Sequence, residues 1–144
     1  MGWLDYHLHM LRAGDEEYGP PSINEDRIGE PVKSERPGIN RLLSQEKQEI
    51  VYEYDFGDGW EVSVTLEKVL PFDESLTPPV CIDGERNGPL EDSGGPLGYQ
   101  DKLRLLANPS LPDPDGIREW IPPEFDPEFF DKDAINAQID EEFL

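Results

Sequence analysis

The sequence predicts an α+β fold, in which helices pack on one face of a mostly antiparallel sheet and the C-terminal half is helical. Apolar and polar residues alternate in the first half, as they do in half-buried strands. The segment Gly57-Asp58-Gly59 separates two such runs, which indicates a hairpin. Helical spacing of apolar residues begins only after residue 96. Because the strands come first and the helices come late, the helices should cover a sheet that is already complete.

Length and composition indicate one cytoplasmic domain over residues 1–144. Only 35% of the residues are hydrophobic, and 15 prolines and 13 glycines indicate that much of the chain is loop. The lone Cys81 excludes an intramolecular disulfide and is typical of a reducing compartment. The sequence shows no signal-like start and no stretch of transmembrane length.

The charge is strongly acidic, with 12 basic against 33 acidic residues and a net charge of −21. A surface of this sign repels nucleic-acid phosphates and anionic membranes, which argues against direct binding of either. Two interpretations stay open. The acidic residues form a solvated surface, or they attract a basic protein partner or bound cations.

The elements before the hairpin are short. The alternation of Leu4, Tyr6, Leu8 and Met10 with polar residues predicts a strand over residues 3–10. Residues 12–38 should be mostly loop, with one short strand near Arg27-Ile28. Ile39 to Ser44 fits a single helical turn that carries two leucines.

Ile50 to Leu70 should form the hairpin, and a three-residue loop at residues 57–59 best matches like with like. The apolar pairs in this register are Phe56 with Trp60, Tyr54 with Val62, Tyr52 with Val64 and Ile50 with Leu66. The aromatic residues then belong to the core face. On the other face Asp55 lies opposite Glu61, a like-charge pair that is exposed or faces a cation or basic partner.

The second half should hold a long loop followed by helices. Residues 71–96 are loop, and a loop of this length is usually functional or disordered. The expected helices are one that Pro96-Leu97-Gly98 opens and that runs through Ala107, one over residues 113–120, a third beginning at Asp126-Pro127 and a fourth over residues 133–143.

Three groups of residues have the chemistry of a site. Asp55 and Asp58 flank a tight turn and could bind a hard cation such as Mg²⁺ or Ca²⁺, although Asp58-Gly59 is also ordinary turn chemistry. Glu91 and Asp92 precede Gly94-Gly95, where helix amides bind an anion or the side chains cap the helix. His7 and His9 share one face of the expected strand, where they form a metal pair or a surface pair.

The motif strings resemble a known family, the plasmid Ri open-reading-frame-three-like proteins, over roughly residues 2–139. The strings are Tyr52-x-Tyr-Asp-Phe-Gly-Asp-Gly-Trp60, Cys81-x-x-Gly84-x-Arg86, Pro89-x-Glu91-Asp92-x-Gly94-Gly95-x-x-Gly98-Tyr99 and Phe125-Asp126-Pro127. The resemblance implies an α+β fold and an association with mobile elements. The family is loosely labelled transposon-passenger or resolvase-like, but the resemblance implies no settled activity. A serine recombinase needs a nucleophilic serine among arginines, and no serine here has that setting.

Three departures from the family pattern bear on chemistry. Family members usually carry a further strand and helix before the Gly2-Trp3 segment. Many have a histidine where this chain has Val62, and a second cysteine where it has Gly88. If the family site were a histidine–cysteine metal centre, this chain would have lost part of it, and an all-carboxylate site would stay open.

Two functions follow from these residues. The first is a non-catalytic binding or protein-interaction module that takes a basic partner or associates with itself, and its candidate binding residues are Asp55, Asp58, Trp60, Arg86, Glu91, Asp92, Gly94, Gly95 and Tyr99. The second is a metal-dependent hydrolase or nuclease-like enzyme that holds a divalent cation through Asp55, Asp58, Glu91, Asp92, His7 and His9. The enzyme requires at least three of these ligands around one point.

Overall fold

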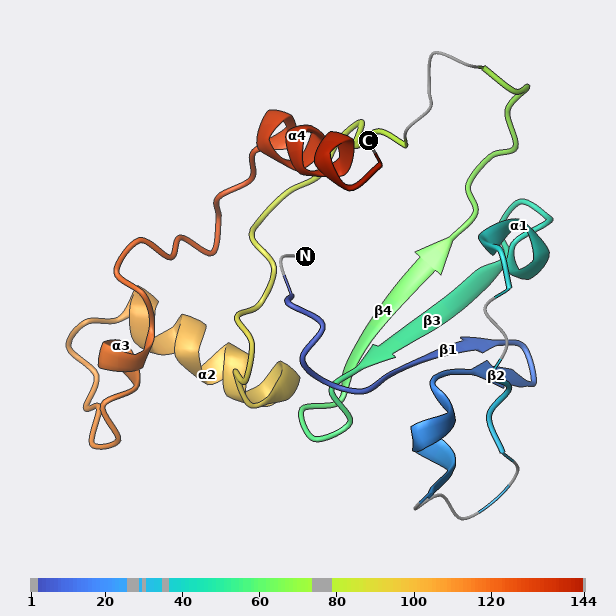
Figure 1. Ribbon diagram of the computed structural model, residues 1–144. Coiled ribbons are helices and arrows are strands. Elements are labelled where there is room, and N and C mark those ends of the chain that lie inside the picture. The colour runs from blue at the N-terminus through green and yellow to red at the C-terminus, as the bar shows by residue number, and fades with distance from the viewer. Residues whose placement is uncertain (1–2, 26–28, 30, 35–36, 74–78, 144) are drawn as a thin grey trace. The chain divides into compact units, whose positions relative to one another are not determined.

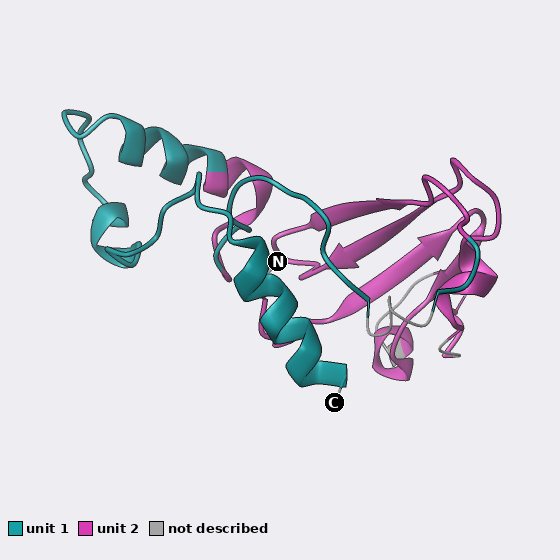
Figure 2. Ribbon diagram, turned by 90° about the horizontal axis from the view of Figure 1, so that it is seen from above, with its two compact units in different colours: residues 1–2, 71–90, 100–144 teal, residues 3–70, 91–99 magenta. Residues whose placement is uncertain are grey.

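The computed structural model describes residues 3–25, 29, 31–34, 37–73 and 79–143. The chain divides into two compact units (Figure 2). The sheet unit comprises Trp3–Leu70 and Glu91–Tyr99, and the helical unit comprises mainly Pro71–Leu90 and Gln100–Leu144. The short strand expected near Arg27-Ile28 lies outside the described residues.

The sheet unit is built on four antiparallel strands in the order β2-β1-β3-β4. The strands are β1 (His9–Ala13), β2 (Glu16–Tyr18), β3 (Glu49–Tyr54) and β4 (Trp60–Thr65). Figure 1 shows β3 and β4 side by side as the two arms of the hairpin. The predicted α+β fold with an antiparallel sheet is therefore confirmed.

The first strand begins later than the alternation predicts. Asp5 adopts a left-handed backbone with φ of 57°, which interrupts an extended run. The backbone N–H of Tyr6 donates to the hydroxyl of Tyr54 at 3.3 Å instead of joining the ladder. The strand consequently starts at His9. The predicted loop after it contains β2 and a short 3₁₀ helix, η1 (Pro21–Glu25).

The hairpin register differs from the prediction by two residues. Tyr54 pairs with Trp60, and the loop spans five residues because Asp55 leaves the strand with φ of 52°. A shift of two preserves the face of every side chain, so Tyr54 is still in the interior and 1% exposed. Phe56 lies in the loop and is 40% exposed, so its predicted place on the core face was wrong.

The like-charge pair across the hairpin is Glu53 with Glu61, where Asp55 with Glu61 was expected. Arg12 on β1 ion-pairs with both carboxylates and offsets their repulsion. The charge on this face therefore depends on three strands.

Two small clusters form the interior of the sheet unit. Ile50 packs with Leu42, the last residue of α1 (Ile39–Leu42), with Leu43, which follows the helix, and with Tyr18 of β2. On the other face, Met10 packs with Ile23 and Val32. The helical turn expected at Ile39 is thus present, and it covers one end of the sheet.

Three further helices are α2 (Gly95–Ala107), which begins in the sheet unit, α3 (Ile117–Trp120) and α4 (Lys132–Phe143). The helix expected from Asp126 is wrong. Asp126 Oδ1 accepts the N–H of Glu128 at 2.9 Å, and Phe129 N bonds to its carbonyl at 3.2 Å, which makes an isolated turn. Within the described residues, we find no helix with the length and apolarity that a membrane span requires.

The loop between α2 and α3 is organised by Arg118. Its guanidinium donates to the carbonyls of Leu105, Asn108 and Leu111 at 3.0–3.3 Å. The carboxylate of Asp113 accepts the N–H groups of Ile117 and Arg118 at 2.8 and 2.9 Å, which satisfies the first two amides of α3. These backbone bonds lower the pKa of Asp113. The helical unit is therefore fixed by polar contacts as well as by packing.

Candidate functional site

The hairpin loop presents one carboxylate oxygen by using the other to close the turn. Asp55 is 9% exposed, and its Oδ1 accepts the N–H groups of Gly57 and Asp58 at 3.0 and 3.3 Å. This is the turn chemistry expected for an Asp in a left-handed position. Its Oδ2 faces the side chain of His7.

The hairpin loop and the loop before α2 meet within the sheet unit. Asp58 Oδ2 accepts the N–H of Gly94 at 2.9 Å. A Cβ atom at Gly95 would lie 2.0 Å from the carbonyl oxygen of Asp58, and Gly95 has φ of 67°. Only glycine satisfies both conditions without displacing the hairpin loop. The two aspartates of the hairpin therefore have different tasks, because Asp58 attaches the second loop and Asp55 faces His7.

Glu91 is held at the edge of the site by two donors. Its Oε1 accepts the hydroxyl of Tyr54 at 2.9 Å and the N–H of Leu4 at 2.7 Å. Burial raises the pKa of Tyr54, and the hydrogen bond to Glu91 raises it further. Because Oε1 is occupied in this way, Oε2 is the oxygen that faces His7, at 4.0 Å.

His7 is the centre of the cluster. Its Nε2 lies 3.1 Å from Asp92 Oδ1, 3.7 Å from Asp55 Oδ2 and 4.0 Å from Glu91 Oε2. One donor atom each from His7, Asp55 and Asp92 lies within 4.8 Å of the other two. The requirement that three of the candidate ligands surround one point is met.

Aromatic rings pack next to the cluster. Trp3 stacks on Tyr54 with ring centroids 4.6 Å apart, and Trp60 lies 5.9 Å from Trp3 and 6.0 Å from Tyr99. The rings of His7 and Tyr54 are nearly perpendicular, with centroids 5.8 Å apart. These rings fix the N-terminal segment, and with it His7, against the hairpin.

The remaining predicted site residues lie elsewhere. His9 Nδ1 is 3.3 Å from Asp5 Oδ1, and its ring lies against Tyr52, so His9 is outside the His7 cluster. Arg86 belongs to the helical unit, where its Nε is 3.7 Å from the carboxylate of Glu128.

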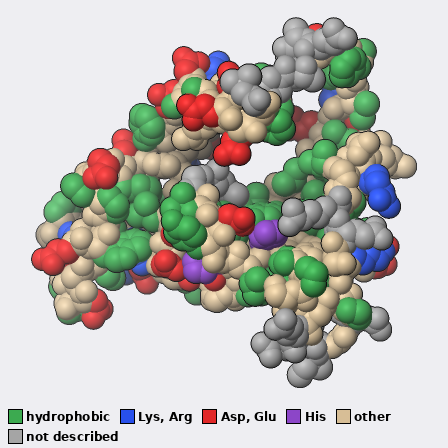
Figure 3. Space-filling model, in the orientation of Figure 1, with side chains coloured by type: hydrophobic (Ala, Val, Ile, Leu, Met, Phe, Trp, Pro, Cys, Tyr) green, Lys and Arg blue, Asp and Glu red, His purple; other side chains and the backbone are tan. Residues whose placement is uncertain are grey.

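Electrostatically, the site is an acidic centre on an acidic protein. On the face shown in Figure 3 both histidines are visible, and acidic side chains lie beside each of them. Asp55, Glu91 and Asp92 carry three negative charges against one titratable imidazole. Neutral imidazole with carboxylate oxygens is a donor set that suits Zn²⁺ or Mn²⁺.

The distances agree with such an ion. Ligands about 2.0–2.2 Å from a tetrahedral ion are separated from one another by about 3.3–3.6 Å. The two distances from His7 Nε2, at 3.1 and 3.7 Å, bracket this separation. The third separation, between the donor oxygens of Asp55 and Asp92, is no more than 4.8 Å.

Two contributors escaped the sequence reasoning, namely the Tyr54 hydroxyl and the Trp3 ring. Tyr54 was assigned to the core for its ring alone. A buried tyrosine hydroxyl needs a polar partner, which is a signal that an acidic residue elsewhere in the chain approaches it. Trp3 gave no comparable signal, because nothing in its local sequence specifies stacking on residue 54.

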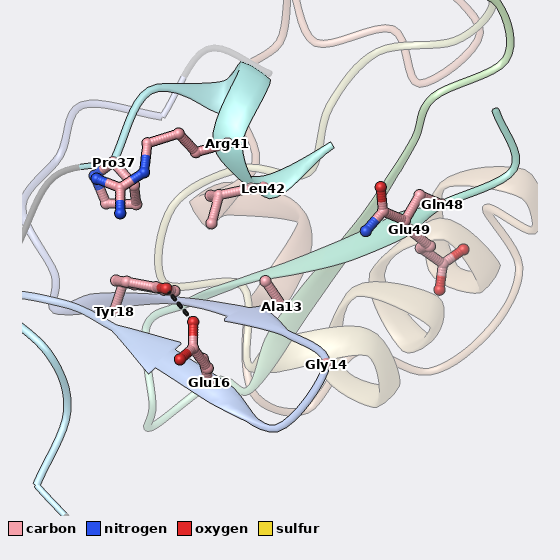
Figure 4. Close-up of a pocket in the computed structure, with 9 residues that line it drawn as sticks. All are labelled: Ala13, Gly14, Glu16, Tyr18, Pro37, Arg41, Leu42, Gln48 and Glu49. Atoms are coloured by element: carbon pink, nitrogen blue, oxygen red, sulfur yellow. Dashed lines mark hydrogen bonds between the residues drawn. The ribbon is translucent and has the colours of Figure 1, made fainter. Parts of the chain in front are cut away.

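A separate cavity of about 260 Å³ lies near the β1–β2 turn (Figure 4). The Tyr18 hydroxyl points to Glu16, which also pairs with Lys33. The bond from Lys33 lowers the pKa of Glu16, and the bond to Glu16 raises the pKa of Tyr18. Because these groups already satisfy one another, the cavity has a structural explanation.

Comparison with known proteins supports the family resemblance. The family model for plasmid pRiA4b ORF-3-like proteins matches residues 1–134. The uncharacterized protein y4hQ of Sinorhizobium fredii (strain NBRC 101917 / NGR234) is 33% identical over 111 residues, which cover 76% of this chain and 56% of that protein. The chain thus spans little more than half the length of this relative.

A solved structure has a similar fold. The crystal structure of a protein of unknown function, MM3350 from Methanosarcina mazei Go1, matches with a TM-score of 0.74 and 33% identity. The match covers 93% of this chain and 75% of the other.

Proposed function

The chain belongs to the plasmid pRiA4b ORF-3-like family, and we propose that it is a non-catalytic binding module with a divalent-cation site at His7, Asp55 and Asp92. The observation that carries the proposal is the mutual approach of these three donors within 4.8 Å. They come from three separate segments of the chain. The lone Cys81 supports placing this module in the cytoplasm.

The charge balance favours binding over hydrolysis of an anionic substrate. With neutral His7, the three carboxylates and a divalent ion sum to a charge of −1. A phosphate ester that approached this site would meet a negative centre. Two basic side chains of the sheet unit are ion-paired with other carboxylates, Arg12 with Glu53 and Glu61, and Lys33 with Glu16. Phosphoryl-transfer sites usually add Arg or Lys to the metal.

Metal titration by calorimetry tests the site, with Zn²⁺, Mn²⁺ and Mg²⁺ added separately. Asp92→Asn should weaken binding by at least tenfold because it removes one anionic ligand. Asp5→Asn is the matched control, since Asp5 has the same chemistry, a similar exposure and a partner outside the cluster. An ion at 100 times its dissociation constant should also stabilise the fold by about 2.7 kcal/mol.

The affinity should fall as the pH is lowered, because protons compete with the metal for His7 and the carboxylates. Equal affinities for wild type, Asp92→Asn and Asp5→Asn would disprove the assignment. If none of the three ions binds, the cluster is an ion-paired part of the fold and the proposal fails.

A metal-dependent hydrolase is the second candidate, favoured by one observation. A set of three protein donors leaves coordination positions open for water or substrate. Metal-dependent cleavage of bis(p-nitrophenyl) phosphate that is lost in Asp92→Asn and kept in Asp5→Asn would support the enzyme. Metal binding without turnover would support the module.

A further inference from the structure

We propose that the outer edge of β4 binds an extended segment of a partner protein in which Lys or Arg alternates with apolar residues. The site for this segment is the row of backbone groups on β4 (Trp60–Thr65) that points away from β3. This inference is independent of the cation site, because His7, Asp55 and Asp92 lie outside β4 and take no part in the proposed binding edge.

The register identifies which backbone groups face outward. β4 is the last strand in the sheet order, and no strand of the described residues pairs with its outer side. Just after β4, the backbone N–H of Leu66 donates to the carbonyl of Gln48 at 2.9 Å. In an antiparallel pair, alternate residues direct their N–H and C=O groups toward the partner strand and the residues between them direct these groups away. The even-numbered residues of β4 therefore bond to β3. The outward N–H and C=O groups are therefore those of Glu61, Ser63 and Thr65.

The edge lacks most of the features that block pairing. Natural edge strands are protected by charged side chains, proline, bulges or short length, and the charge of Glu61 is the feature of this kind in β4. β4 has six residues, contains no proline or lysine, and keeps a continuous register from Trp60 to Thr65. An edge of this kind can accept a strand through main-chain hydrogen bonds.

The two faces of β4 define the side chains of the segment. Trp60, Val62 and Val64 are half-buried on one face, and the exposed Glu61, Ser63 and Thr65 lie on the other. The second face also carries Glu17, Glu49 and Glu53, with Arg12 as its cation, so the strands contribute four negative charges and one positive charge. A strand beside β4 would be stabilised by basic residues on this face and apolar residues on the opposite one.

The charge of the whole chain selects the occupant. A second copy would bring together two molecules that each have a net charge of −21 and would place Glu61 near another acidic edge. A basic segment gains attraction from the same charges. We therefore assign the edge to a different, basic protein chain.

The test uses a synthetic capped peptide of alternating Lys and Val, eight residues long, with an alternating Glu and Val peptide as the charge control. Binding is measured by fluorescence anisotropy at 50 mM salt on the full chain. Amide hydrogen exchange, read per residue by NMR, follows Glu61, Ser63 and Thr65. The basic peptide should bind and slow exchange at these amides at least tenfold, whereas the acidic peptide should do neither.

Ser63→Pro and Ser63→Ala form the matched pair of variants. Proline is tolerated where a strand's N–H faces outward, so Ser63→Pro should keep the fold and remove one edge donor. It should weaken binding at least tenfold, and Ser63→Ala less than twofold. If Ser63→Pro unfolds the chain, Glu61→Lys replaces it and should weaken binding by at least fivefold through charge.

Three outcomes would overturn the proposal. The first is no binding of the Lys–Val peptide at 1 mM. The second is equal binding of the two peptides, or protection of amides away from β4. The third is concentration-dependent dimerisation, measured by sedimentation, that protects the β4 amides without peptide, because the occupant would then be a second copy.

Discussion

The hydroxyl group of Tyr54 connects the hairpin to the loop that carries the acidic half of the site, and Tyr54→Phe tests this connection. The substitution keeps the ring that stacks on Trp3 and removes two hydrogen bonds, the one to Glu91 at 2.9 Å and the longer one that the hydroxyl accepts from the N–H of Tyr6 at 3.3 Å. A hydrogen bond to a charged group contributes about 1.5–3 kcal/mol to stability. The N–H of Leu4 still reaches Glu91, so the carboxylate keeps one donor.

We therefore expect Tyr54→Phe to lower the free energy of unfolding by about 1.5–3 kcal/mol. With a urea dependence of about 2 kcal/mol per M, a loss of 2 kcal/mol moves the midpoint by about 1 M. Trp3 stacks on Tyr54, and Trp60 lies 5.9 Å from Trp3, so tryptophan fluorescence reports the unfolding of the sheet unit.

Tyr6→Phe is the control, because it makes the same chemical change at a side chain that is 74% exposed. It should change stability by less than about 0.5 kcal/mol, as surface substitutions usually do. A Tyr54→Phe midpoint indistinguishable from that of Tyr6→Phe would refute the idea that this hydrogen bond holds the two loops together.

The pH dependence of the same variant gives an independent check. The raised pKa of Tyr54 means that its neutral form is favoured in the folded chain. Its contribution is therefore complete below the ordinary tyrosine pKa of about 10 and is lost as the pH rises through the higher folded value. Tyr54→Phe should flatten the alkaline fall in stability above pH 10, relative to wild type.

Three further substitutions test the fold that supports the site. Gly95→Ala should destabilise the chain by at least about 2 kcal/mol in thermal melts, and clearly more than Gly14→Ala, whose left-handed backbone has open space around it. Because the pKa of Asp113 is lower in the folded chain, its carboxylate stabilises the fold above the pKa of the unfolded state, and this contribution is lost as the pH falls through the folded-state pKa. Asp113→Asn should therefore flatten the acid dependence of the urea midpoint between pH 6 and 2. Arg118→Lys should destabilise the helical unit by about 1–3 kcal/mol in hydrogen exchange, since it loses the fork that binds three carbonyls, whereas Arg104→Lys at an exposed position should have little effect.

Local sequence patterns predicted the features that depend on local physics. The α+β class, the helical turn at Ile39 and the faces of the hairpin all follow from periodicity and turn residues. Side chains alternate with a period of two along a strand, so a register error of two residues left the faces of the residues in β3 and β4 correct, while Phe56, in the loop, was misplaced. A three-residue loop gives the largest number of apolar pairs, whereas in the structure Asp55 closes a five-residue loop through its own carboxylate.

The composition of the site could be predicted better than its geometry. Asp55, Asp92 and His7 were all candidates from residue type and motif, and the structure brings them together. Their meeting depends on contacts that no local pattern encodes, such as the N–H of Leu4 on Glu91, 87 residues away. For the same reason the sequence could not show which of His7 and His9, two histidines on one face of the expected strand, would reach the carboxylates.

Backbone conformation links the local and the distant features of this site. Asp55 and Asp92 both have left-handed backbones, with φ of 52° and 53°, a conformation that costs an L-residue about 1–2 kcal/mol relative to the right-handed one. Aspartate lowers this cost by bonding to nearby amides, as Asp55 does with Gly57 and Asp58. Strained positions persist only where surrounding contacts over-determine them, and they cluster at functional sites. Asp5, which lies outside the His7 cluster, also has a left-handed backbone with φ of 57°. The proposed role of Asp55 and Asp92 therefore rests on the distances of their carboxylates from His7 and not on backbone conformation.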